Sequence, residues 1–212
     1  MKTKNYPLKR GGPDRLVVSY AKQWQDITLK IDDTIIGTIP DKETLKAGVN
    51  FTLEDDSILE VGLAGKQLKI SRGGKPIPGS AEDPQLKVDS AVKVIDVIAL
   101  LRCAFGILAI VGLPFLVELG FTRLVGIFTL VEAAIFVILG ILVKRLSKIA
   151  LMIAIALVVL GLIYSLTVSL SSGNFPAVGV GIACAFLYIM IQGIPAIQLL
   201  KDEKAALEDA ME

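Results

Sequence analysis

A single carboxylate, Glu132, interrupts the apolar stretch IFTLVEAAIFVILGIL, which runs from Ile127 to Leu142. A charged group near the middle of a bilayer is costly unless it is neutral, paired or hydrated. Such a carboxylate can bind a proton or a cation, join two helices, or hold a partner protein. Two more polar side chains lie inside neighbouring apolar stretches, Arg102 and Gln192. These three intramembrane polar residues are the first candidates for a function.

Three interpretations of Glu132 stay open on the sequence alone. It is a neutral structural lock that is hydrogen-bonded to Ser165, Thr167, Ser169 or Gln192. Alternatively it is a polar anchor that faces another subunit, or a proton or cation site in a translocation path. Arg102 is long enough to reach back to the lipid headgroups. It differs in depth from Glu132 by several ångströms, so a direct pair between them requires helix tilt or a bridging water.

The residue types needed for common catalytic and metal sites are missing. The sequence has no histidine, which excludes histidine metal ligands, histidine bases and Ser-His-Asp or Cys-His arrangements. Its two cysteines, Cys103 and Cys184, lie inside apolar stretches, where we expect them to pack rather than to form a disulfide. The glycines of GGKPIPGS do not have the spacing of a phosphate-binding loop. We therefore expect no enzyme activity, no metal and no cofactor.

The charges divide the chain into two parts. Residues 1–93 contain 15 Lys and Arg and 13 Asp and Glu, a balance that is typical of a soluble domain and argues against nucleic-acid binding. From Val97 to Leu200 only seven charged residues occur. The apolar runs between them reach the ~20 residues that a hydrocarbon core requires. We predict four transmembrane helices, at about 95–117, 123–143, 148–170 and 177–200.

The polar part of the chain has the alternation of antiparallel strands. In DITLKID the apolar side chains of Ile27, Leu29 and Ile31 alternate with polar ones, which predicts one buried and one solvated face. The residues DD at 32–33 then mark the turn of a hairpin over 26–40. About six strands are expected in 15–78, as a small β-sandwich or a rolled meander, with DKETLKAG as one helical turn. Trp24 is expected to pack in the core or at its rim, with a role as a ligand platform as the alternative.

The fold class is accordingly α+β, an antiparallel β-domain followed by a four-helix transmembrane bundle. We expect a flexible N-terminus at 1–14, a linker and leading helix at 79–94, and a cytoplasmic tail at 201–212 that forms a short exposed helix. Asp89 or Ser90 is the expected N-cap of the leading helix. Pro114 and Pro195 are expected to kink or end their helices. Small residues predict close helix packing at Ala99, Cys103, Gly106, Gly179 and Ala183.

The β-domain resembles a known family. The segments WQDITLKID and LKISRGGKPIPG are similar to the Trp-led strand and the late strand with a glycine-containing turn in the Fas apoptotic inhibitory molecule β-sandwich. The similarity covers about 60 residues, and it implies a non-enzymatic interaction domain without assigning any functional residue. In general character the whole chain resembles multi-pass membrane proteins of bacteria, cyanobacteria among them.

The basic residues of the short loops predict the orientation in the membrane. Lys144, Arg145 and Lys148 lie between the second and third spans, whereas the loop SSGNFP between the third and fourth has no charge. The positive-inside rule therefore places the 144–148 loop and both termini in the cytoplasm. The absence of an apolar segment after the basic N-terminus, and so of a signal peptide, agrees with this orientation. The expected location is a plasma, inner or thylakoid membrane.

Two functions follow from these features. The first is an integral-membrane interaction protein, namely an adapter, assembly factor or regulator of a membrane complex, whose cytoplasmic β-domain is anchored by the helices. The alternative is a small oligomeric transporter or channel that uses Glu132. Membrane lipid and a membrane-protein partner, or a second copy of the chain, are the expected partners.

Overall fold

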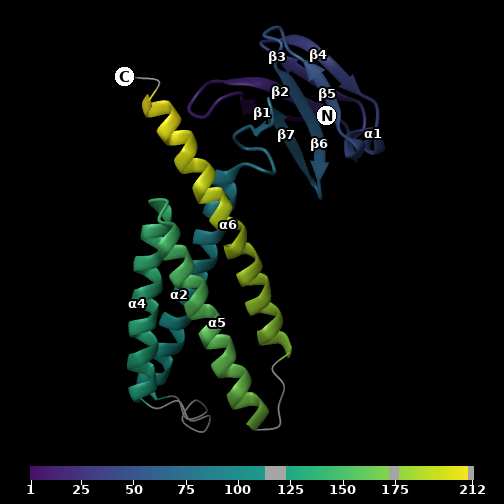
Figure 1. Cartoon of the computed structure of the whole chain (residues 1–212). Helices are drawn as coiled ribbons and strands as arrows, with labels where there is room; N and C mark the ends of the chain where they lie inside the picture. Colours follow the sequence, from purple (N-terminus) through teal and green to yellow (C-terminus); the bar gives the residue numbers. More distant parts are fainter. Residues whose placement is uncertain (113–122, 172–176, 210–212) are drawn as a thin grey trace. The chain divides into compact units, whose positions relative to one another are not determined.

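The structure is a computed structural model that describes residues 1–112, 123–171 and 177–209. Within it the chain forms two compact units, Met1–Leu86 and Lys87–Glu212 (Figure 1). The first unit contains the strands and one short helix, and the second contains long apolar helices. The predicted α+β class is therefore confirmed.

Two four-stranded antiparallel sheets make up the first unit, and each is a simple meander. The first sheet has the order β1-β2-β3-β4 and the second β5-β6-β7-β8. Strands of the first sheet are β1 (Lys2–Pro7), β2 (Asp14–Tyr20), β3 (Ile27–Ile31) and β4 (Thr34–Ile39). The helix α1 (Lys42–Ala47) leads to β5 (Val49–Thr52), β6 (Ile58–Ala64), β7 (Gln67–Arg72) and β8 (Lys75–Pro76). The six predicted strands and the single helical turn are all present.

One buried cluster fills the space between the two sheets. Both sheets supply it with alternate residues of their strands, such as Leu16 and Leu29 from the first sheet and Leu59 and Ile70 from the second. Period-two alternation places these side chains on one face of each sheet. A core shared by two sheets makes the domain a β-sandwich, which was one of the two predicted forms.

The N-terminus is a strand, so the prediction of a flexible segment at 1–14 was wrong. Lys2 to Tyr6 pair in register with β2, and Tyr6 is buried in the sandwich core. Four exposed polar residues precede Tyr6, so the segment shows neither alternation nor an apolar run. Its place at the edge of the sheet is decided by backbone pairing and by one aromatic side chain, neither of which gives a periodic signal.

The first residues of the predicted linker are folded onto the sandwich. Asp83 is buried and accepts hydrogen bonds from the backbone N–H groups of Gly79 (2.7 Å) and Gln85 (3.0 Å). It also forms an ion pair with Arg10 (2.8 Å). Helix α2 (Pro84–Val111) therefore begins directly after Asp83, with proline at its first position. The expected N-cap at Asp89 or Ser90 was wrong, because both residues lie inside this helix.

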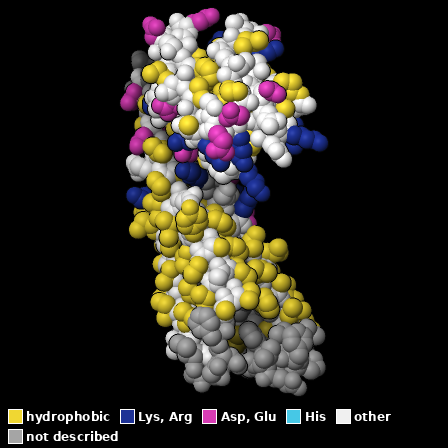
Figure 2. Space-filling model, turned by 90° about the vertical axis from the view of Figure 1, so that its right-hand side faces the viewer, with side chains coloured by type: hydrophobic (Ala, Val, Ile, Leu, Met, Phe, Trp, Pro, Cys, Tyr) yellow, Lys and Arg dark blue, Asp and Glu magenta, His cyan; other side chains and the backbone are white. Residues whose placement is uncertain are grey.

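Four helices of the second unit are long and apolar enough to cross a membrane, as predicted. They are α2, α4 (Arg123–Lys144), α5 (Lys148–Ser171) and α6 (Ala177–Asp209). Pro195 lies inside α6 and does not end it, and the helix continues into the predicted tail. Pro114 lies outside the described residues, as does the end of the first predicted span. On the face seen in Figure 2, hydrophobic side chains cover the helices.

The buried core of this unit is concentrated at one end of the bundle. It is drawn from Val88 to Ala99 of α2, Phe136 to Val143 of α4, Ala150 to Ala154 of α5 and Met190 to Leu200 of α6. These segments adjoin the α4–α5 turn, which carries the basic residues. In the other half, α5 has no buried residue over 155–169, and α6 has none over 177–189. Helices α5 and α6 are thus packed at the basic end and open at the other end, whereas α2 and α4 also bury Gly106, Ala109, Gly126 and Ala133 in that other half.

Candidate functional site

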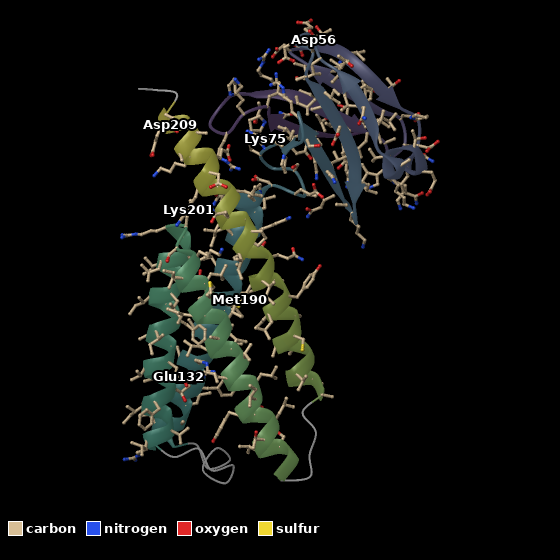
Figure 3. The ribbon with its side chains drawn as sticks, viewed as in Figure 1. Asp56, Lys75, Glu132, Met190, Lys201 and Asp209 are labelled. Atoms are coloured by element: carbon tan, nitrogen blue, oxygen red, sulfur yellow. The ribbon has the colours of Figure 1, made fainter. Side chains whose placement is uncertain are left out.

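The two charged residues inside the apolar bundle form a direct ion pair. Arg102 of α2 donates through Nη1 to Oε2 of Glu132 on α4. Figure 3 shows Glu132 on α4, well away from the end of the bundle where Lys201 lies. The structure therefore joins two predicted site residues without a bridging water. The long arginine side chain spans the difference in depth that separated them in the sequence analysis.

Aromatic and backbone groups surround the guanidinium of Arg102. Its Cζ atom lies 5.7 Å from the ring centroid of Phe136, which is one helical turn beyond Glu132 and is buried. A cation over the face of an aromatic ring is attracted by the ring quadrupole. From α5, Gly161 leaves room for the guanidinium, since a Cβ at this position would lie 3.3 Å from Nη2. Arg102 thus lies where α2, α4 and α5 meet.

A second ion pair joins the same two helices nearer the basic end. Lys144 Nζ lies 3.6 Å from Oδ2 of Asp96. A Cβ at Gly140 would lie 3.1 Å from Oδ1 of Asp96, so the glycine admits this carboxylate next to α4. Asp96 and Lys144 were not predicted to pair. A signal was available, because both lie at one end of their spans and have opposite charges.

Glycines bring the backbones of α2 and α4 together beyond the Arg102–Glu132 pair. A Cβ at Gly126 would lie 2.8 Å from the carbonyl oxygen of Gly106 and 3.0 Å from the backbone nitrogen of Ile110. Gly106, one of the residues predicted to allow close packing, lies at this contact, and its partner Gly126 was not predicted. Small residues allow this approach, and in lipid the resulting van der Waals contact is what holds helices together.

The ion pair is only partly covered by the described residues. The side chain of Arg102 is 31% exposed and that of Glu132 is 51% exposed. The pair lies beyond the buried cluster of the bundle, in the part where α5 and α6 have no buried residue. A charged group in hydrocarbon is stabilised by pairing and by polar or packed surroundings. The exposed side of this pair is therefore the place where a further group would make a favourable contact.

The predicted hydrogen-bond partners of Glu132 include Thr167 and Gln192, and neither is bonded to the Arg102–Glu132 pair. Thr167 donates its hydroxyl to the carbonyl of Ile163, and Gln192 makes no hydrogen bond with Arg102 or Glu132. The hydrogen bond that Glu132 accepts comes from Arg102, which was not among the partners predicted for a neutral structural lock.

The predicted packing residues have different surroundings. Ala99 is buried in the core of the bundle, while Cys103 and Ala183 are half-buried. Around Gly179 no described atom lies within 4 Å of the point where a Cβ would be, so the expected close contact at this glycine is not formed.

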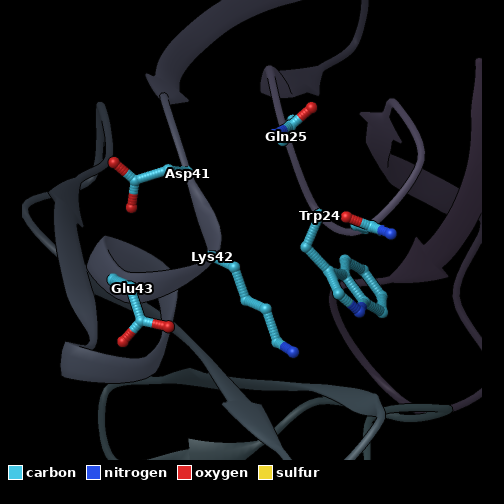
Figure 4. A pocket seen from close by; sticks show the side chains of 6 residues that line it. Trp24, Gln25, Asp41, Lys42 and Glu43 are labelled. Atoms are coloured by element: carbon cyan, nitrogen blue, oxygen red, sulfur yellow. The ribbon is translucent and has the colours of Figure 1, made fainter.

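The β-domain has a hollow beside its only tryptophan. Trp24 stacks on Tyr20 with ring centroids 4.2 Å apart, which confirms packing at the rim of the core. The connection from β2 to β3 is strained, because Gln23, Trp24 and Asp26 have positive φ values of 62°, 64° and 49°. A hollow of about 600 Å³ lies beside this connection. Figure 4 shows Lys42 and Trp24 among the side chains that line it.

The described residues do not form a cluster of metal ligands, and the chain matches no known protein. No group of three or more Cys, Asp or Glu in the described ranges is arranged to hold a metal ion. No protein-family model, no curated protein and no solved structure matches the chain. The candidate sites must therefore be interpreted from their own geometry.

Proposed function

We propose that the protein is a membrane-anchored interaction protein, namely an adapter, assembly factor or regulator of a membrane complex. In this proposal the four helices fix the β-domain to the membrane and contribute a binding surface of their own. The partner is a second membrane protein whose transmembrane helix packs on the open half of the bundle.

The partly exposed Arg102–Glu132 ion pair supports this proposal most directly. Pairing makes the site neutral, but Glu132 remains 51% exposed at a depth where lipid offers no hydrogen bond. A polar side chain on a partner helix can donate to the carboxylate, and such interhelical contacts contribute about 1 kcal/mol each. The surrounding exposed apolar residues, including Ile135 and Val131, supply van der Waals contacts. Polar recognition inside an apolar surface gives such a contact its specificity.

A second candidate, an oligomeric transporter or channel, is favoured by the same exposure. A carboxylate that is accessible from the open half of the bundle can exchange a proton or a cation. The ion pair weighs against this candidate, because Arg102 already neutralises Glu132. A transport role would require that the pair separates during each cycle.

Co-purification from native membranes tests the proposal. Tagged wild type and Glu132→Gln are extracted in mild detergent, and their partners are identified and quantified by mass spectrometry. We expect a stoichiometric membrane-protein partner with the wild type and at least a roughly tenfold loss in the variant, on the scale of a lost charge-assisted hydrogen bond. Glu208→Gln is the matched control, because it makes the same change on the exposed final turns of α6.

A double variant separates recognition from folding. Arg102→Glu/Glu132→Arg exchanges the two charges and keeps an ion pair between α2 and α4. If the partner recognises the carboxylate, the exchanged protein is stable but does not bind it. Recovery of wild type and all variants as the same lone oligomer would contradict the adapter proposal. Loss of ion flux in proteoliposomes on Glu132→Gln, with this oligomer intact, would then support the transporter.

A further inference from the structure

One end of the β-sandwich has an open cleft between its two sheets. The first sheet contributes the ends of β1 and β3 and the starts of β2 and β4, while the second contributes the β5–β6 turn and the end of β7. The cleft has a volume of about 470 Å³. Ligand sites in proteins fall in the range of roughly 300–1,000 Å³ and combine apolar walls with a few polar groups.

The inside of this cleft is aliphatic. Leu8, Ile31, Ile36 and Leu53 line it, and each of them packs against the buried core without being buried itself. Two more exposed aliphatic residues, Ile35 (58%) and Ile58 (47%), lie next to its turns along the chain. They are the strand residues of the domain that expose large aliphatic side chains. The apolar surface is thus concentrated at the strand ends that border the cleft.

Two arginine–aspartate pairs stand at the mouth, one on each sheet. Arg15 donates from Nε to both carboxylate oxygens of Asp32, at 2.9 and 2.8 Å. On the second sheet Arg72 pairs with Asp55 and donates to Ser57 Oγ at 3.0 Å. These contacts link the acidic turn of each sheet to an arginine on a strand of the same sheet.

The mouth carries an excess of negative charge. The β3–β4 turn contributes Asp32 and Asp33, and the β5–β6 turn contributes Glu54, Asp55 and Asp56. Three of these carboxylates, Asp32, Glu54 and Asp55, line the cleft together with the two guanidinium groups. Asp33 and Asp56 adjoin them in the turns, as Lys9 adjoins Leu8. In the described part of the chain, Asp33, Glu54 and Asp56 have no cation within ion-pair distance. Figure 3 shows Asp56 at an extremity of the domain.

The acidic β3–β4 and β5–β6 turns both border this cleft. Attraction to Glu54 is one of the causes that raise the pKa of Arg15, after the hydrogen bond and the charge of Asp32. Glu54 belongs to the second sheet and Arg15 to the first, so the acidic turns face each other across the cleft. A ligand in the cleft is consequently exposed to negative charge from both sides.

We propose that this cleft binds a basic peptide segment with an aliphatic anchor, contributed by the juxtamembrane region of a membrane-protein partner. The aliphatic side chain enters the slot between the sheets, and flanking Lys or Arg residues meet the uncompensated carboxylates. Cytoplasmic flanks of transmembrane helices are enriched in Lys and Arg. A domain that is covalently joined to the apolar helices through α2 meets such segments at high effective concentration. This assignment rests on the proposed function, whose partner crosses the same membrane.

Peptide binding to the full-length protein in nanodiscs of neutral lipid tests the assignment. The probe is a fluorescent hexapeptide of two leucines flanked on each side by a lysine and an arginine, and anisotropy reports its binding. We expect saturable binding that weakens with salt, and no binding of peptides in which serines replace the leucines or glutamates replace the basic residues. Glu54→Lys should weaken binding about tenfold at low salt, because attraction at the rim becomes repulsion.

A matched charge reversal locates the site. Glu43→Lys makes the same change in α1, beside the Trp24 hollow, and should leave binding within twofold of the wild type. As a second variant, Asp33→Asn/Asp56→Asn removes two acids, and asparagine suits their positive φ values. We expect it to reproduce the loss of binding. Unchanged fluorescence of Trp24 shows that the domain of each variant is folded.

Equal weakening by Glu43→Lys and Glu54→Lys would overturn the assignment, since only general charge would then matter. A larger effect of Glu43→Lys would place the site at the Trp24 hollow and would overturn it too. The proposed function fails separately, when no membrane partner accompanies the wild-type protein. Peptide binding in nanodiscs requires no such partner, so the two results are distinguishable.

Discussion

At the scale of single residues, Asp55 links the stability of the β-domain to pH. The hydrogen bond from Ser57 is the largest cause that lowers its pKa to about 2 from the usual 3.8, and Arg72 adds to it. A lowered pKa means that the folded state favours the carboxylate. The resulting stabilisation is complete above about pH 4 and is lost as the pH falls toward 2.

Asp55→Asn should therefore reduce the free energy of unfolding at pH 7 and flatten its decrease between pH 4 and 2. The fluorescence of Trp24, the single tryptophan, reports unfolding of this domain during denaturant titrations at each pH. Asp26→Asn is a suitable control, because asparagine tolerates the positive φ at this position. An unchanged pH dependence in Asp55→Asn would show that the interactions with Ser57 and Arg72 do not stabilise the fold.

The sequence identified Glu132 and Arg102 as candidate functional residues inside apolar helices, but it did not predict that they pair directly with each other. A lone carboxylate in an apolar run is a strong signal, because little else tolerates that position. Their pairing depends on how far an arginine side chain reaches and on the room left by Gly161, which are properties of the packed helices. The charges of Asp32, Glu54 and Asp55 were visible as turn residues, but their meeting at one cleft required the arrangement of the sheets.

At the scale of elements, the backbones of α2 and α4 approach each other closely at Gly106 and Gly126. Gly126→Val should force the two backbones apart, because even a Cβ there would lie 2.8 Å from the carbonyl oxygen of Gly106. We expect a loss of stability of roughly 1–3 kcal/mol or more, as for overpacked sites. Thermal unfolding of the purified protein in detergent measures this loss.

Gly181→Val provides the matched control on α6, where no described atom lies within 4 Å of an added Cβ. It should leave the midpoint of thermal unfolding within a degree or two of the wild type, as for exposed substitutions. If the two variants unfold at the same temperature, the close contact between α2 and α4 does not contribute to stability.

Elements with a periodic or continuous apolar signal were predicted well, and those without one were missed. Strands β3 and β6 alternate, and the four membrane helices are long apolar runs. The edge strand β1 and the two-residue strand β8 are polar or proline-containing, and they owe their place to backbone pairing with β2 and β7. The start of α2 was placed too late, because the capping role of Asp83 depends on its burial against the sandwich.

At the scale of the whole molecule, the orientation in the membrane is a direct test of the charge pattern. Both termini and the α4–α5 turn are expected on the cytoplasmic side. In a chain whose Cys103 and Cys184 are replaced by alanine, single cysteines at Lys22, Arg145 and Lys204 should react with a membrane-impermeant maleimide only in inside-out vesicles. A cysteine at Arg123, at the opposite end of α4, should react only in vesicles of the other orientation. Labelling of Lys22→Cys and Arg145→Cys from different sides would contradict this topology.

In the described residues, α5 and α6 are buried only toward the basic end of the bundle. The buried residues of α5 and α6 lie at that end, so a change in the tilt of these two helices displaces their residues more, the farther they are from it. Helices adjust their tilt when the bilayer becomes thicker or thinner. The stretches 155–169 of α5 and 177–189 of α6 have no buried residue and lie farthest from that end, so we expect their displacement to be the largest. We expect bilayer thickness to change how far these stretches lie from the rest of the bundle, and therefore how much of the Glu132 carboxylate is covered.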